Sequence, residues 1–259
     1  MTARTAGAAT TEDRLLNGRV RLRQSADGYR AAIDPVFLAA AVPPGGPCSV
    51  LDLGCGAGAA TLCLLARLPE AQVTGLEVQP RLAALARDNA ALNDWAHRFE
   101  VVEGDIADRN LLAGVPSAAN ASAGGGFDEV MCNPPHHRAE TAAAPEPAKA
   151  TATREDRAAL DDWVEVALAH VRRKGAVTFI HRADRLDDLL AAFRGRAGGI
   201  IVFPLWPKPG EAARRVLVRA RKGVRAPLTL AAGLVLHTAD NRFTPAAEGV
   251  LREGHGLAL

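Results

Sequence analysis

Short apolar runs alternate with helix-like segments along most of the chain, and this alternation constrains the fold more than any other feature. The apolar, strand-like runs span 50–53, 73–78, 99–102, 127–132, 176–180, 200–205 and 215–220. The helix-like segments span 59–68, 81–93, 158–171 and 184–194. Strands that alternate with helices form a mostly parallel sheet that is covered on both faces. The pattern therefore predicts an α/β fold, a Rossmann-like doubly wound sheet of seven strands.

The connection between the last two strand-like runs differs from the earlier ones. It is the proline-rich segment 204–210. A parallel crossover needs a dozen or more residues, so this segment is too short to contain a crossover helix. We therefore expect the last strand to pair antiparallel within an otherwise mostly parallel sheet.

A glycine-rich turn follows the first strand, in the segment 51–58 (LDLGCGAG). Glycines let the backbone turn tightly and approach a ligand that a Cβ atom would obstruct. The helix that follows offers free N–H groups at its N-terminus. Glu77 ends the second strand, 23 positions after Gly54, where its carboxylate can accept hydrogen bonds from a ribose diol. Together these features predict a nucleoside-containing cofactor.

The glycine pattern alone leaves two cofactors open. Gly54, Gly56 and Ala59 also satisfy the dinucleotide fingerprint G-x-G-x-x-G/A with an acid about 20 residues further on, which would make the chain an NAD-dependent oxidoreductase. Asp52 favours a methyltransferase, because its carboxylate would repel a pyrophosphate but suits the amino group of a sulfonium cofactor. Asp105, after the third strand, is placed to hold the cofactor's adenine amine or to serve as a turn residue.

The segment Asn133-Pro134-Pro135-His136 follows the fourth strand and favours the sulfonium cofactor over NAD. Two prolines end the strand, fix the main chain and leave carbonyl groups exposed. The Asn133 side-chain oxygen and the Pro134 carbonyl can then both accept hydrogen bonds from one planar NH₂ group. Methylation of an aromatic amine requires such a pair of hydrogen bonds, because the nitrogen lone pair is delocalised into the ring and must be aligned with the methyl donor.

These motifs together resemble those of the amino-methylating class I S-adenosylmethionine-dependent methyltransferases, whose pattern is D-x-G-x-G-x-G followed by N-P-P-aromatic. The segment 28–40 (GYRAAIDPVFLAA) is similar to the region before the cofactor loop in the bacterial valine-tRNA adenine-N6 methyltransferase family. The closing segment, from Pro204 through 215–218 to His237, is similar to that family as well. The resemblance covers roughly 18–251, nearly the whole chain.

The resemblance implies an S-adenosylmethionine-dependent N-methyltransferase that acts on the exocyclic N6 amine of an adenine in tRNA. The implied cofactor-binding residues are Asp52, Gly54, Cys55, Gly56, Gly58, Glu77, Asp105 and Ile106. The implied catalytic residues are Asn133, Pro134, Pro135 and His136. Asp34 and Pro35 are interpreted as a helix N-cap and the first helical residue.

His136 departs from the family pattern, which ends in Tyr, Phe or Trp. An aromatic ring at this position stacks on the flipped base. Imidazole also stacks, although it offers less area and titrates near neutral pH. We expect His136 to stack on the target base; a changed substrate preference and weakened activity are the alternatives.

Basic residues are concentrated near both ends of the chain, although its net charge is only +2. Such regions can attract a polyanion, and solvated strand ends are the alternative interpretation. The predicted RNA-contacting residues are Arg19, Arg21, Arg23, Arg30, Arg214, Arg215, Arg221 and Lys222.

The expected organisation is a single domain, as a length of 259 residues allows. Its parts are a disordered tail (1–13) and a methyltransferase domain (14–259) made of an N-terminal extension (14–46), a catalytic core (47–225) and a C-terminal segment (226–259). Two segments rich in small residues, 113–126 and 139–153, are expected to be loops. The sequence leaves open whether they order on substrate binding.

Several classes of protein are disfavoured by the composition. No apolar run is long enough to cross a bilayer, and the first eleven residues lack the apolar region of a signal peptide. The four cysteines, Cys48, Cys55, Cys63 and Cys132, show no metal-ligand spacing. We expect a cytoplasmic, reduced protein without a metal, either a monomer or a homodimer.

Three alternatives to an RNA adenine methyltransferase remain at this point. The same hydrogen-bond acceptors could hold a protein glutamine, the guanine N2 amine or a small-molecule amine. An oxidoreductase would use the glycine loop for NAD. A non-catalytic RNA-binding relic is suggested by His136 alone.

Overall fold

The computed structural model describes residues 10–26, 32–46, 48–108, 125–135 and 160–259. The segment predicted as the loop 139–153, most of the segment 113–126, and the predicted site residues Arg30 and His136 lie outside the described residues.

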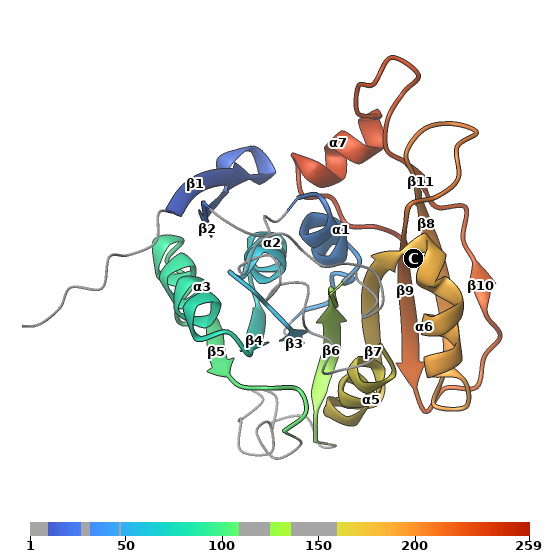
Figure 1. The fold of residues 1–259 in the computed structure, drawn as a ribbon, viewed down its shortest axis with the longest axis horizontal. Coiled ribbons are helices and arrows are strands. Elements are labelled where there is room, and N and C mark those ends of the chain that lie inside the picture. Colours follow the sequence, from blue (N-terminus) through green and yellow to red (C-terminus); the bar gives the residue numbers. More distant parts are fainter. Residues whose placement is uncertain (1–9, 27–31, 47, 109–124, 136–159) are drawn as a thin grey trace, which may run out of the picture.

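A nine-stranded sheet forms the centre of the fold (Figure 1). Its strands are β3 (Cys48–Leu53), β4 (Ala71–Glu77), β5 (Phe99–Glu103), β6 (Phe127–Cys132), β7 (Val171–Arg182), β8 (Ala197–Trp206), β9 (Arg215–Lys222), β10 (Thr229–Leu230) and β11 (Leu234–Val235). Their order is β10-β8-β9-β7-β6-β3-β4-β5, and β11 also pairs with β8. Strand β9 is antiparallel to both of its neighbours, and the other pairs are parallel.

The doubly wound, mostly parallel fold is confirmed, with β9 as the expected antiparallel strand. The predicted count of seven strands is wrong for the described sheet, because β10 and β11 extend it beyond the seven long strands. Each of these two strands has two residues, which is too short for a period-2 pattern to appear in the sequence.

Helices cover both faces of the sheet (Figure 1). They are α1 (Asp34–Ala40), α2 (Ala59–Arg67), α3 (Pro80–Leu92), α5 (Leu160–His170), α6 (Leu186–Phe193) and α7 (Pro245–Leu251). Side chains of α1, α2 and α3 share one buried core with Val50, whereas α5 and α6 share a second core with Leu51 and Leu53. Strand β3 therefore buries alternate side chains on opposite faces, as its continuous apolar run predicts. No described helix is long and apolar enough to cross a membrane.

A separate hairpin precedes the sheet, formed by β1 (Thr10–Leu15) and β2 (Val20–Ser25). The prediction of a disordered tail over 1–13 is therefore wrong for Thr10–Asp13, which belong to β1. Val20 and Leu22 of β2 are fully buried, whereas Arg21 and Arg23, which alternate with them, are exposed. Because of this alternation, the apolar face of β2 packs against the helices.

Two asparagines of α3 hold the hairpin in place by hydrogen bonds. Asn93 accepts from the Arg21 N–H at 2.8 Å and donates to the Arg21 carbonyl at 2.7 Å. Asn89 does the same for Arg23, at 2.8 Å and 2.9 Å. Residues four apart lie on one side of a helix, so both amides face β2. Each amide bonds the N–H and the carbonyl of one β2 residue, as a neighbouring strand would.

Candidate cofactor and substrate site

The turn between β3 and α2 depends on three glycines in the left-handed backbone region. Their φ angles are 71° for Gly54, 56° for Gly56 and 88° for Gly58, values that other residues adopt only at a cost. A Cβ on Gly54 would lie 2.9 Å from the Trp163 ring, and one on Gly58 would lie 2.9 Å from the Phe99 ring. A Cβ on Gly56 would meet no described atom within 4 Å. Open space therefore borders the turn at Gly56.

Asp52, at the end of β3, is a buried carboxylate directed toward α2. It is 2% exposed and accepts a hydrogen bond from the Thr61 hydroxyl at 2.7 Å. Burial raises the pKa of Asp52 to about 7, against the effect of the Thr61 hydrogen bond, and the negative charge of Glu77 adds to the rise. Among the described residues no cation pairs with Asp52, which leaves this carboxylate available to a positively charged ligand group.

Glu77, at the end of β4, is bound directly to the glycine turn. One carboxylate oxygen accepts from the Gly56 N–H at 2.8 Å, and the other accepts from the Gln79 N–H at 2.9 Å. The side chain is 4% exposed, and burial raises its pKa. Because each carboxylate oxygen can accept a second hydrogen bond, Glu77 can hold the turn and a ligand hydroxyl together.

The segment after β5 lies beside Glu77. The Gly104 N–H donates to the Glu77 carbonyl at 2.9 Å. Asp105 accepts from the Ala107 N–H at 2.9 Å, so it forms the turn that its sequence position allowed, and its second carboxylate oxygen forms no hydrogen bond within the described chain. Ile106 is buried. Both residues therefore border the same edge of the sheet as the glycine turn.

Cys55 contributes to the turn through its backbone. Its N–H donates to the Leu76 carbonyl at 3.0 Å, and its thiol packs against Gly75, where an added Cβ would lie 2.7 Å from the sulfur. Burial raises the pKa of the thiol well above its usual value. The side chain is a buried packing group beneath the turn and has no thiolate character.

Asn133 follows β6 directly beside the glycine turn, because Cys132 at the end of β6 pairs in register with Leu53 of β3. The side-chain oxygen of Asn133 is buried and has no hydrogen-bond partner in the described part of the chain. Pro134 is buried and Pro135 is half-buried. A buried carbonyl without a partner costs free energy, so this oxygen is a position where a ligand can supply a donor.

The sequence analysis missed some residues around the site. Thr61 binds Asp52, and Trp163 of α5 covers Gly54. Asn89 is fully buried and donates to the Ala57 carbonyl at 2.9 Å as well as to the hairpin. The position of Thr61 in the helix after the loop is a weak hint, whereas the contacts of Trp163 and Asn89 depend on the tertiary fold.

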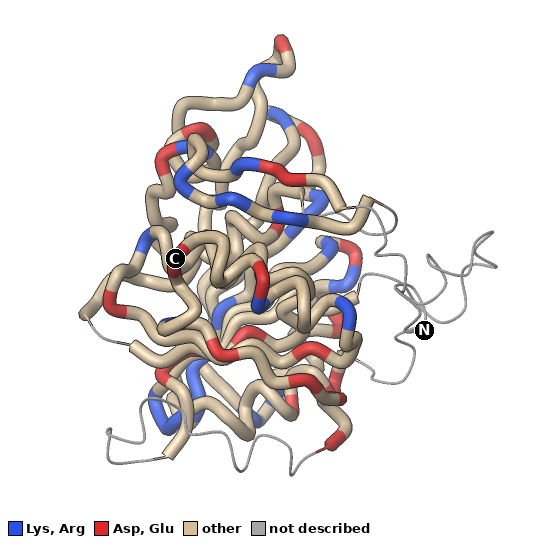
Figure 2. Tube along the Cα trace, turned by 90° about the vertical axis from the view of Figure 1, so that its left-hand side faces the viewer, with Lys and Arg blue, Asp and Glu red and all other residues tan. Residues whose placement is uncertain are grey.

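The predicted RNA-contacting residues divide between two edges of the sheet. Arg214 and Arg215 lie at the edge that carries Asn133, because Arg215 pairs in register with Arg182 at the end of β7. Arg221 and Lys222 lie at the opposite edge, about 20 Å further along β9 for a strand rise of about 3.3 Å per residue. Figure 2 shows basic positions interspersed with acidic ones along the described chain on the side in view.

Most of these basic side chains already have partners. Arg221 donates to the Lys174 carbonyl, and Lys222 donates to the Val171 carbonyl at 2.9 Å. Arg21 and Arg23 both approach Glu12, at 2.9 Å and 3.5 Å. The exposed Arg214 side chain, in contrast, forms no ion pair with any described residue.

Arg215 and Arg19 form structural contacts. Arg215 donates to the Asp34 carboxylate at 2.8 Å. The interpretation of Asp34 as an N-cap is therefore corrected: it is the first residue of α1, Pro35 is the second, and the side chain pairs with β9 instead of capping the helix. Arg19 donates to the Leu16 and Glu253 carbonyls, which joins the hairpin to the C-terminal segment.

Known methyltransferases resemble this chain in sequence and in fold. The profile of the methyltransferase small domain family matches residues 36–182. A tRNA1(Val) (adenine(37)-N6)-methyltransferase of Porphyromonas gingivalis is 29% identical over 88% of this chain and 89% of its own length. The Actinobacillus succinogenes protein of the same name is 27% identical over 87% and 90%. A crystal structure of a predicted O-methyltransferase from Agrobacterium tumefaciens is 31% identical, with a TM-score of 0.71, over 87% of this chain and 99% of that one.

Proposed function

This chain belongs to the methyltransferase small domain family, and we propose from that premise that it methylates the exocyclic N6 amine of an adenine in tRNA, with S-adenosylmethionine as the methyl donor. A tRNA substrate would place its activity in the cytoplasm. Because the chain belongs to a methyltransferase family, the alternative of an NAD-dependent oxidoreductase is wrong. The adenine N6 amine as methyl acceptor is proposed.

The observation that carries the proposal is the buried, unpartnered oxygen of Asn133 next to the glycine turn. An amine bound there would donate to this oxygen and, through its second hydrogen, to the Pro134 carbonyl. Two acceptors at fixed positions orient the nitrogen lone pair toward the methyl donor and favour the pyramidal nitrogen of the transition state. The proton leaves the amine after transfer, so the residues need to align the amine and need not deprotonate it first.

The cofactor is proposed to lie along the edge formed by Asp52, Gly56, Glu77 and Asp105. The unpaired carboxylate of Asp52 suits the amino group of the methionine part, Glu77 suits the ribose hydroxyls, and the free oxygen of Asp105 suits the adenine amine. The open space at Gly56 would admit the cofactor close to the backbone. Bound S-adenosylmethionine supplies an electrophilic methyl group, and the protein supplies alignment.

Replacing glycines of the turn by alanine is expected to separate ligand binding from folding. Gly56→Ala places a Cβ in open space, so it should weaken S-adenosylhomocysteine binding by tenfold or more and cost about 1–2 kcal/mol of stability for its backbone conformation. Gly58→Ala should cost clearly more stability, because its Cβ also meets the Phe99 ring. Calorimetric titration and urea unfolding measure both effects. Wild-type affinity in Gly56→Ala would contradict the proposed cofactor position.

The proposed RNA contact is tested at Arg214, and Arg221 provides the matched control. Arg214 is exposed at the edge that carries Asn133, and Arg221 lies at the opposite edge. Arg214→Gln is expected to raise the KM for tRNA severalfold and to reduce the slope of log affinity against log salt by about one unit, as loss of one phosphate contact does. Arg221→Gln should change neither quantity. Equal effects of both substitutions would contradict a contact confined to this edge.

The choice of acceptor is tested by methyl transfer from labelled S-adenosylmethionine. Unmodified tRNA, a glutamine-containing protein and small amines are offered in parallel reactions, each with Asn133→Ala as the control enzyme. Transfer to tRNA that requires Asn133 is expected. Transfer to protein or small amines alone would overturn the tRNA proposal, and cofactor binding without transfer to any acceptor would favour a non-catalytic protein.

A further inference from the structure

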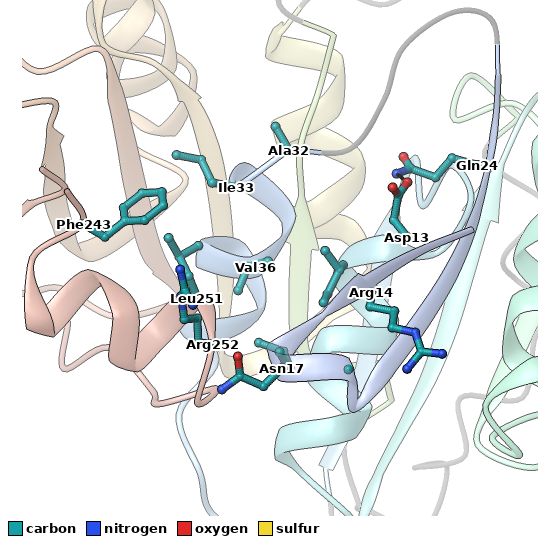
Figure 3. A pocket seen from close by; sticks show the side chains of 13 residues that line it. Asp13, Arg14, Asn17, Gln24, Ala32, Ile33, Val36, Phe243, Leu251 and Arg252 are labelled. Carbon is teal, nitrogen blue, oxygen red and sulfur yellow. Dashed lines mark hydrogen bonds between the residues drawn. The ribbon is translucent and has the colours of Figure 1, made fainter. Parts of the chain in front are cut away.

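A groove of about 700 Å³ lies between the hairpin, α1 and α7, apart from the proposed cofactor edge (Figure 3). Its lining includes Asp13, Arg14, Gln24, Ala32, Phe243 and Arg252. Its volume is within the range of roughly 300–1,000 Å³ that is typical of ligand sites. The predicted N-terminal extension and C-terminal segment thus form the two walls of one groove.

One end of the groove lies toward the site edge of the sheet. Ser25, at the end of the hairpin, bonds Arg81 in the first turn of α3, and this turn follows directly after Glu77. The other end of β2 lies beside Asn93, at the end of α3. Gln24 and Ala32 are therefore at the end of the groove nearest the glycine turn, and Ala32 is two residues from Asp34, which bonds Arg215 at that same edge.

Next to Gly18 and Arg252, at the other end of the groove, a hydrogen bond from Arg19 to the Glu253 carbonyl joins the hairpin to the C-terminal segment. A molecule that leaves the groove past Gln24 and Ala32 would therefore approach the site edge.

The walls combine an aromatic ring with cationic groups. The Phe243 ring lines the groove and stacks on His237, with 4.5 Å between ring centroids and an interplanar angle of 26°. Arg14 lines the hairpin wall and forms no ion pair with any described residue. Arg252 lines the α7 wall, 59% exposed and 3.5 Å from Glu248. The one acidic side chain in the lining, Asp13, accepts a hydrogen bond from Gln24 at 2.7 Å.

We propose that this groove binds the single-stranded RNA next to the target adenine, with a neighbouring base against Phe243 and the backbone phosphates near Arg14 and Arg252. Aromatic platforms beside cationic groups are typical of single-stranded nucleic-acid sites. The lining holds two cations, Arg14 and Arg252, against one acid, Asp13, which favours RNA over a peptide, and the groove end at Gln24 and Ala32 lies toward the site edge. The proposal rests on the proposed function, because it needs an RNA acceptor.

The test measures methyl transfer to unmodified tRNA at several tRNA concentrations. Phe243→Leu keeps an apolar side chain but removes the ring, and it is expected to raise the KM for tRNA by about tenfold. Arg252→Gln is expected to raise it severalfold, whereas the matched control Arg173→Gln, an exposed arginine at the opposite edge of the sheet, should leave it unchanged. The Kd for S-adenosylhomocysteine should stay at the wild-type value in all three variants.

Each outcome distinguishes this inference from the proposed function. If wild type methylates tRNA and both groove variants keep the wild-type KM, the groove inference is overturned and the function stands. If wild type binds S-adenosylhomocysteine but methylates no tRNA, the function itself is overturned. If Phe243→Leu fails to fold, Arg252→Gln still decides, because that side chain is exposed. Binding of labelled peptides, but not of single-stranded RNA, to the wild-type groove would also overturn the inference.

Discussion

Asn133→Ala is expected to lower kcat for methyl transfer to tRNA by about 100- to 1,000-fold, the loss typical when one group that stabilises a transition state is removed. The reason is that the buried Asn133 oxygen, which has no partner in the described chain, would bind the amine in the position for attack. The Kd for S-adenosylhomocysteine should change by less than about twofold, because the cofactor is assigned to Asp52, Glu77 and Asp105. Single-turnover kinetics and calorimetric titration measure the two quantities.

The matched variant for this prediction is Asn133→Asp. It keeps a side-chain oxygen that accepts a hydrogen bond at the same position, so it should retain more activity than Asn133→Ala. A kcat in Asn133→Ala within threefold of wild type would show that this oxygen does not hold the amine. A parallel loss of cofactor affinity would instead indicate a structural role.

Asp52→Asn is expected to stabilise the cofactor-free protein while it abolishes tight cofactor binding. The pKa of Asp52 is about 7 in the folded protein, because of burial, and 3.8 is its ordinary value. Between these values the folded state holds a proton that the unfolded state has released, so the stability contributed by this group falls as the pH rises from about 4 to about 7. The amide removes this cost and can still accept the Thr61 hydrogen bond.

The expected size follows from about 1.4 kcal/mol for each unit of pKa. Asp52→Asn should raise the free energy of unfolding at pH 8 by about 2–4 kcal/mol, and the difference should disappear toward pH 4. Its affinity for S-adenosylhomocysteine at pH 8 should fall by about 100-fold or more, through loss of the charge that would face the amino group. Urea unfolding at pH 4 and pH 8 tests the first statement. A variant less stable than wild type at both pH values would contradict it.

The sequence predicted those features that depend on local chemistry. The β6 strand and the glycine turn were predicted because apolar runs, glycines and prolines act through the local backbone. The antiparallel direction of β9 was predicted from the length of a single connection. Asp52 and Glu77 were expected at one edge of the sheet because each lies at or next to the end of a parallel strand, and such ends meet there.

The features that were missed depend on contacts between distant segments. The hairpin is held by Asn89 and Asn93, more than 60 residues away in the chain, so the polar β1 could not be distinguished from a disordered tail. Arg215 appeared as one member of a basic run, but its partner Asp34 is 181 positions away. Charge counts along the sequence therefore could not separate arginines that stabilise the fold from the exposed Arg214.

The measurement that tests the central claim most directly identifies the atom that receives the methyl group. Wild type and Asn133→Ala are incubated with S-adenosylmethionine and unmodified tRNA, and the tRNA is digested to nucleosides for mass spectrometry against synthetic standards. The account predicts N6-methyladenosine in the wild-type reaction and its absence with Asn133→Ala. A methyl group on guanine N2 or on a ribose oxygen, or a tRNA left unmodified while S-adenosylhomocysteine binds, would contradict the claim.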